Sequence, residues 1–132
     1  MSDSLAPSVA IAQIFSSARV DAKHWQVAWK IENRGDAPLT IHSAWLPHSQ
    51  FRAPEKQFGN LEIAPRARTQ IGFVVEFAAP RATEIENAFL IMRVNYRGAA
   101  WKIFARVRVH IEQNRAPRAT TELITVQKTE GR

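Results

Sequence analysis

Cysteine is absent from the sequence, and several kinds of chemistry are absent with it. Without cysteine there are no disulfides, no thiolate nucleophile and no cysteine-ligated zinc. Only five glycines are present, and neither a Gly-x-Ser-x-Gly turn nor a Gly-x-x-x-x-Gly-Lys phosphate loop occurs. Because small secreted domains often depend on disulfides, their absence favours a reducing compartment.

Long apolar runs are missing as well. No stretch approaches the roughly 20 apolar residues that a membrane-spanning helix needs. The segment Met1–Pro7 contains an early acid and a proline and has no basic stretch ahead of an apolar run, so it does not resemble a signal peptide. We therefore expect a cytoplasmic protein by default, without membrane insertion.

Positive charge is in excess but scattered along the chain. Eighteen lysines and arginines against twelve acids give a net charge of +6, and no three basic residues are consecutive. This balance is compatible with binding of nucleic acid or another polyanion, and equally with a general preference for arginine. With 132 residues, 45% of them apolar, the chain can form one domain with its own core.

Alternation of apolar and polar residues is the dominant pattern, and it is typical of strands with one dry and one wet face. It is clearest in Lys23–Asn33, Thr69–Phe77 and Trp101–Ile111. Trp25 and Trp29 share the apolar face of the first of these segments, so we expect both in the core. Weaker strands are expected at Val9–Ser17, Leu39–Trp45, Asn60–Ile63, Ala88–Tyr96 and Thr120–Lys128.

Turn signals divide these segments. Asn33–Pro38 is rich in turn residues, and Arg97-Gly98 fits the tip of a tight hairpin. Helical periodicity is not convincing anywhere in the sequence, and Ala82–Asn87 has room for a single helical turn at most. The prolines Pro47, Pro54, Pro65 and Pro80 fall between apolar runs. Apolar positions change phase within Val9–Ser17, which predicts a bulge.

We expect an all-β fold, an immunoglobulin-like antiparallel β-sandwich of about seven to eight strands over residues 1–112. Residues 113–132 are expected to form a polar linker and a C-terminal tail that leaves room for an extra strand.

The passage Val27–Pro38 into Leu39–Ile41 resembles the B-to-C connection of bacterial immunoglobulin-like domains of the CARDB (cell-adhesion-related bacterial) type. Those domains often continue with an apolar-x-apolar-x-Pro-Gly step, and here Leu61–Arg66 has arginine where glycine is frequent. Most of Val9–Ile111 can be aligned with that pattern. The resemblance implies a non-enzymatic recognition or spacer module and supplies no site residues. Such domains are often extracellular and repeated, whereas this sequence shows neither a signal peptide nor a repeat.

Catalytic and metal-binding patterns are not found. The histidines His24, His42, His48 and His110 form no known motif; His42 and His48 flank a bend at Trp45–Pro47 and could supply two metal ligands, but no further ligands can be assigned. Glu84 and Glu86 are expected to be solvated carboxylates rather than an acid–base pair. We therefore expect no enzyme activity, no metal and no cofactor.

The hairpin with Arg97-Gly98 at its tip allows its register to be counted outward. One face then pairs Val94 with Trp101, Met92 with Ile103, Leu90 with Ala105 and Ala88 with Val107, and is apolar throughout. The other face pairs Arg93 with Lys102, Ile91 with Phe104 and Phe89 with Arg106, with Arg108 beyond. If Phe89, Ile91 and Phe104 stay exposed to water, each loses about 1.5–3 kcal/mol of stabilisation that burial would give. We therefore expect this face to be covered.

An apolar centre rimmed by basic residues has the composition of a recognition surface. The predicted binding residues are Phe89, Ile91, Arg93, Lys102, Phe104, Arg106 and Arg108. Alternatively, Thr120–Lys128 or the strand that carries Glu76 could fold over this face. The predicted function is a non-catalytic protein-interaction or structural module that binds a protein partner or a second copy, with electrostatic binding of nucleic acid or another polyanion as the alternative.

Overall fold

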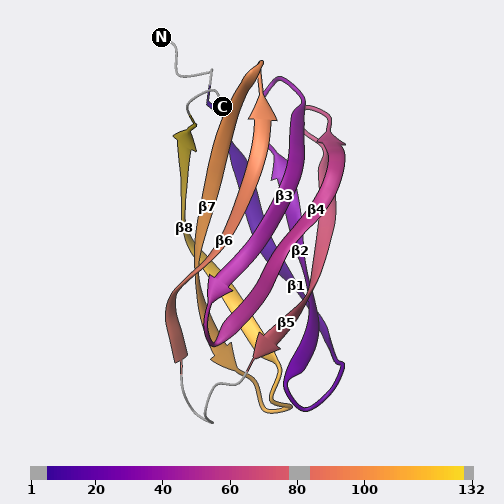
Figure 1. Ribbon diagram of the computed structural model, residues 1–132, viewed down its shortest axis with the longest axis vertical. Coiled ribbons are helices and arrows are strands. Elements are labelled where there is room, and N and C mark those ends of the chain that lie inside the picture. The colour runs from indigo at the N-terminus through magenta and orange to yellow at the C-terminus, as the bar shows by residue number, and fades with distance from the viewer. Residues whose placement is uncertain (1–5, 78–83, 130–132) are drawn as a thin grey trace.

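The protein is all-β and antiparallel, with eight strands in one strongly curled sheet that nearly closes into a barrel (Figure 1). The computed structural model describes residues 6–77 and 84–129, and only the backbone of residues 15–17. The strands are β1 (Val9–Arg19), β2 (His24–Asn33), β3 (Leu39–His48), β4 (Phe51–Ile63), β5 (Arg68–Phe77), β6 (Glu84–Tyr96), β7 (Ala99–Ile111) and β8 (Pro117–Lys128). They are arranged in the order β1-β2-β5-β4-β3-β6-β7-β8. No helix in the described part of the chain is long and apolar enough to cross a membrane.

The three clearest alternating segments form strands β2, β5 and β7, as predicted. In β2 the residues Trp25, Val27, Trp29 and Ile31 are buried, and the residues between them face outward. Trp29 has no exposed surface and meets the rings of Phe51 and Phe73 edge-to-face, with 6.0 Å between ring centroids in both pairs. The period of two therefore gives the buried face of β2 correctly.

The sheet is joined weakly at two places. Between β4 and β5 only Phe51–Phe77 and Arg52–Glu76 pair, after which the two strands diverge. Between the outer strands β1 and β8 the buried side chain of Gln13 forms the bridge. Its amide nitrogen donates to the carbonyl oxygen of Pro117 (3.1 Å), and its amide oxygen accepts a hydrogen bond from the Ala119 N–H (2.5 Å). The side chain therefore makes the same two hydrogen bonds to β8 that a backbone peptide group of a paired strand would make.

Asn33 joins two turns at the end of the molecule where the β2–β3 and β4–β5 connections meet. It is fully buried, and its amide nitrogen donates to the carbonyl oxygens of Ala37 (2.8 Å) and Ile63 (3.0 Å). Its amide oxygen accepts the Gly35 N–H at 3.0 Å. The sequence identifies Asn33 as a turn residue but not as the connection between two turns.

Two sequence predictions about local structure are confirmed. The register of β1 on β2 shifts between Ile14 and Ala18, which is the expected bulge; the side chain of Phe15 lies outside the described residues. Arg97 and Gly98 have φ angles of 53° and 77°, as expected for the two central residues of a type I′ hairpin turn.

Other local predictions are wrong. Asn87 has a φ of 59° beside a register shift between Ile85 and Ala88, so residues 84–87 form a bulged strand start rather than a helical turn; residues 82 and 83 and Pro80 lie outside the described part. Pro47 and Pro54 lie inside β3 and β4 rather than between strands. Beyond Arg52, β4 pairs with β3 alone, and a strand with one open side tolerates proline.

The C-terminal segment is part of the sheet. The expected strand at Thr120–Lys128 is confirmed, but it begins three residues earlier, at Pro117, so the connection after β7 is a short turn. All of β8 pairs antiparallel with β7, from Ile111 opposite Pro117 to Trp101 opposite Lys128. Strand β8 therefore belongs to the same sheet as the strands that precede it.

Candidate interaction face

The β6–β7 hairpin has the register predicted from the sequence. Val94 lies opposite Trp101, Met92 opposite Ile103, Leu90 opposite Ala105 and Ala88 opposite Val107 on the inner face; on the outer face Arg93 lies opposite Lys102, Ile91 opposite Phe104 and Phe89 opposite Arg106. Val94, Met92, Leu90 and Ala88 are buried in the core. All seven predicted binding residues therefore lie on the outer side of two neighbouring strands.

An apolar band crosses this outer side. Phe89 and Phe104 meet edge-to-face, with 6.5 Å between their ring centroids, and Ile91 lies directly opposite Phe104. All three are half-buried rather than freely exposed, because they pack on one another and on the neighbouring strands. On β8, Leu123 extends the band and is 48% exposed.

Trp45 on β3 belongs to the same band and was not among the predicted site residues. It pairs with Ile91 in the β3–β6 ladder, and the guanidinium of Arg93 lies 4.9 Å from the centre of its ring. The sequence indicates an unusual tryptophan beside Pro47, but it does not show that β3 is the neighbour of β6. Without that neighbour, counting along one hairpin cannot place Trp45 in the site.

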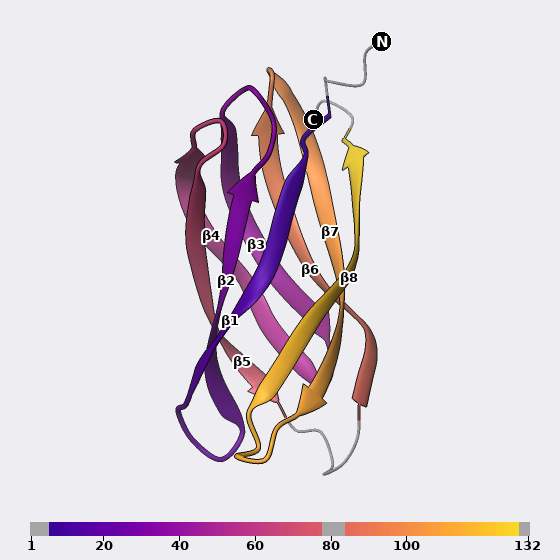
Figure 2. The same cartoon turned by 180° about the vertical axis from the view of Figure 1, so that it is seen from behind.

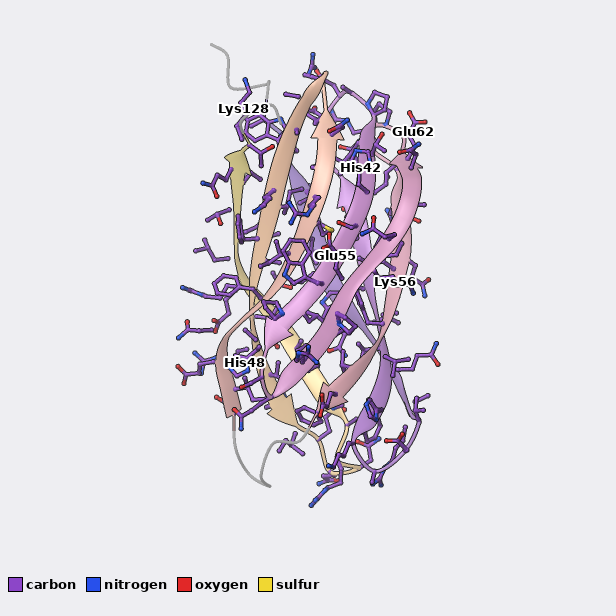
Figure 3. The ribbon with its side chains drawn as sticks, in the orientation of Figure 1. His42, His48, Glu55, Lys56, Glu62 and Lys128 are labelled. Carbon is purple, nitrogen blue, oxygen red and sulfur yellow. The ribbon has the colours of Figure 1, made fainter. Side chains whose placement is uncertain are left out.

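Glu55 neutralises one of the predicted cations. It accepts a hydrogen bond from the Ser43 hydroxyl (2.6 Å) and one from Arg93 Nε (3.1 Å). These donors, the serine hydroxyl first and the guanidinium after it, hold the pKa of the Glu55 carboxyl below its usual range. Figure 3 shows Glu55 on β4, beside β3, at mid-height on this side of the molecule.

Three more carboxylates hold the arginines at the other end of the band. Arg108 Nε donates to Glu122 (2.8 Å), and its Nη1 reaches Glu84 (3.0 Å) and Glu86 (3.3 Å). Arg106 forms a longer ion pair with Glu122, at 3.6 Å. The expectation that Glu84 and Glu86 are merely solvated is therefore wrong. Hydrogen bonds from this guanidinium, first to Glu122 and then to Glu84, raise the pKa of Arg108 above its usual range.

The rim of the band is consequently mixed rather than basic. Arg93, Arg106 and Arg108 all have carboxylate partners, while Lys102 has none within ion-pair distance among residues 6–77 and 84–129. The cations lie on β6 and β7, and their partners come from β4, β8 and the start of β6. The sequence-based view counted only the charges of one hairpin and so missed this compensation.

Neither internal cover proposed from the sequence is present. Strand β8 extends the sheet beside β7 and does not fold over its face, and Figures 1 and 2 both show it at the side of the molecule. The Glu76-bearing strand, β5, pairs with β2 in the other half of the sheet. In the part of the chain that the structure describes, the band is therefore left half-open.

The described residues contain no group of three or more histidines, aspartates or glutamates that could hold a metal ion. His42 and His48 lie towards opposite ends of β3 (Figure 3), so they do not form the conceivable two-ligand site. His48 Nδ1 accepts the Gln50 N–H at 3.1 Å in the turn that follows.

The sequence matches no protein-family model and no curated protein. Inferences about function therefore depend on the chemistry of the faces described above.

Proposed function

We propose that this chain is a non-catalytic protein-interaction module that uses the outer face of β3, β6, β7 and β8. One observation carries the proposal: the half-open apolar band formed by Trp45, Phe89, Ile91, Phe104 and Leu123 is bordered by charged groups on both sides. An apolar and aromatic centre with a polar rim is typical of protein interfaces. Arginine stacked on tryptophan adds a residue pair that is enriched there.

The architecture that supports this face is proposed to be an immunoglobulin-like sandwich. In constant-type immunoglobulin domains the first, second, fourth and fifth strands form one sheet, and the third, sixth and seventh form the other. Here β1-β2-β5 forms one half of the curled sheet and β3-β6-β7 the other, with β8 added beyond β7. Strand β4 departs from the constant-type order, because most of it pairs with β3. The weak β4–β5 junction favours two packed layers over an evenly closed barrel.

We infer that the partner on this face is a second copy of the chain, because the charge of the face is divided between its ends. Towards the β6–β7 turn, Arg93 and Lys102 face one carboxylate, Glu55, which leaves one positive charge. Towards the other end, Arg106 and Arg108 face Glu84, Glu86 and Glu122, which leaves one negative charge. A two-fold axis across the strands places each positive end against the negative end of the other copy.

A polyanion is the less favoured partner. Binding to nucleic acid depends on cations that are free to contact phosphates. Three of the four cations on this face already have carboxylate partners, and a phosphate would have to displace them.

Sedimentation velocity over a concentration series tests the proposed pairing. Wild-type protein should show a reversible dimer that weakens as salt is raised, because the end-to-end charge contacts are screened. Phe104→Asp puts a carboxylate in the middle of the band and should give a monomer with an unchanged circular dichroism spectrum. Val74→Asp is the matched control, since Val74 is 49% exposed on β5, outside the band, and its variant should still dimerise.

Two results would contradict the proposal. A wild-type chain that stays monomeric at millimolar concentration, or a Val74→Asp variant that loses the dimer as Phe104→Asp does, would show that the band is not a self-association surface. Fluorescence anisotropy with an oligonucleotide tests the alternative. We expect only weak binding that disappears near 0.15 M salt, roughly physiological ionic strength. Salt-tolerant binding that is lost when Arg93, Lys102, Arg106 and Arg108 are replaced together would favour the polyanion.

A further inference from the structure

A second candidate site lies at the end of the molecule away from the β6–β7 turn. The β1–β2 hairpin and the β7–β8 turn lie side by side there in both views (Figures 1 and 2). Between them is a pocket of about 220 Å³. Its lining includes Arg19 and Lys23 from the hairpin, Trp25 from β2, Phe77 from the end of β5, Ile111 from β7 and Arg115 from the turn.

The described residues that line the pocket include three cations and no acid. In the described residues no carboxylate lies within ion-pair distance of Arg19, Lys23 or Arg115, whereas six other arginines do have such partners. Arg19 Nε donates only to the backbone oxygen of Asp21, at 3.2 Å. The Asp21 carboxylate itself accepts hydrogen bonds from the Lys23 N–H and His24. Positive charge at this pocket is therefore available for a ligand.

The floor of the pocket is apolar and fixed. Trp25 is 6% exposed and Phe77 is 7% exposed, so the core holds both side chains and only a small part of each is open at the pocket. Ile111 completes this floor from β7. A floor of this kind gains nothing from a bare inorganic anion, but it can bury an aromatic or branched aliphatic group.

We propose that this pocket binds a carboxylate attached to an apolar group. The carboxylate would accept charge-assisted hydrogen bonds from the two guanidiniums and the ammonium, and the apolar group would rest on Trp25 and Phe77. Two sources carry this chemistry: a free organic acid, and the C-terminal carboxylate of a peptide that ends in a large apolar residue. The pocket shares no residue with the interaction face, so this inference does not depend on the proposed function.

Titration of ¹⁵N-labelled full-length protein with phenylacetate, followed by amide chemical shifts, tests the proposal. Saturable shifts are expected at Ala22, Lys23 and Arg115. Phenylacetamide, which has the ring without the charge, and inorganic phosphate, which has the charge without the ring, should each bind at least about tenfold more weakly. Arg115→Gln should weaken phenylacetate binding at least about fivefold. Arg68→Gln removes another exposed charge, at the opposite end of the molecule, and should leave the affinity unchanged.

The source of the carboxylate is decided by a peptide ending in phenylalanine, compared with its C-terminal amide. Tighter binding of the acid-ended peptide than of phenylacetate assigns the pocket to chain termini, and the reverse assigns it to free acids. Absence of saturable shifts at the pocket overturns the proposal, as does equal binding of phenylacetate and phenylacetamide. Equal affinity of Arg115→Gln and Arg68→Gln, with Lys23→Gln also without effect, overturns it too.

Discussion

At the scale of single residues, Asn33 does more for this fold than its place in a turn suggests. A fully buried side-chain amide that is hydrogen-bonded to four backbone groups joins two connections that are distant in sequence. If the amide is removed, three carbonyl oxygens and one N–H lose this partner, and each of them that stays buried without another partner costs about 1–3 kcal/mol. Water that enters the vacated space would satisfy some of them.

We therefore predict that Asn33→Ala lowers the free energy of unfolding by about 2–4 kcal/mol. The control is Asn60→Ala on an exposed part of β4, which should change it by less than about 0.5 kcal/mol. Urea denaturation of the two variants measures both values. A similar small loss in both would mean that Asn33 is an ordinary turn residue.

At the scale of whole strands, the sequence predicts the strand pairings that are set by a turn between two consecutive strands. The β6–β7 pairing follows from one turn, Arg97-Gly98, and from the period of two, so its register can be counted from the sequence. The sequence predicts only the end of the long strand β4, as Asn60–Ile63, because residues 54–62 are mostly exposed and lack alternation. Its existence depends on pairing with β3, which is set by the hairpin turn at Ser49-Gln50.

The candidate face shows the same limit. The predicted residues from β6 and β7 do lie together, but Trp45, Glu55 and Glu122 come from strands whose positions depend on the whole sheet order. Sheet order is a non-local property that pattern and turn chemistry do not determine. A charge count made on one hairpin therefore predicted a basic rim where the folded protein has ion pairs.

Gln13 controls another property at this scale, the closure of the sheet between β1 and β8. We predict that Gln13→Leu lowers the free energy of unfolding by about 1–3 kcal/mol, because the Pro117 oxygen and the Ala119 N–H lose their buried partner. Hydrogen exchange at the Ala119 amide should accelerate more than exchange in the β6–β7 ladder. Gln70→Leu on the exposed side of β5 is the control and should have little effect on either. Unchanged exchange at Ala119 in Gln13→Leu would contradict this role.

At the scale of the whole molecule, a chain with a net charge of +6 relies on its carboxylates to offset repulsion. Asp36, paired with Arg97, and Glu55, hydrogen-bonded to Ser43 and Arg93, both have a pKa below the usual range. A carboxyl group with a lower pKa in the folded state stabilises that state above its unfolded pKa, and this contribution is lost as the pH falls through the folded value. Acid should therefore destabilise the fold by protonating groups that hold arginines on its surface.

Glu55→Gln isolates one of these contributions within the proposed interaction face. Glutamine resembles protonated glutamate, so the variant should unfold at a lower temperature than the wild type at pH 7. The gap should narrow as the pH falls from the ordinary glutamate pKa, about 4.3, through the lower pKa of the folded state, because the wild-type carboxyl becomes protonated over that range. Raising the salt concentration at pH 7 should also narrow it, because Arg93 and Glu55 are both partly exposed and their attraction is screened. Calorimetric melts of both proteins between pH 2 and pH 7 measure the gap. If it stays constant down to pH 2, the effect of the variant is not the loss of a charge, and Glu55 does not act as the anionic partner of Arg93.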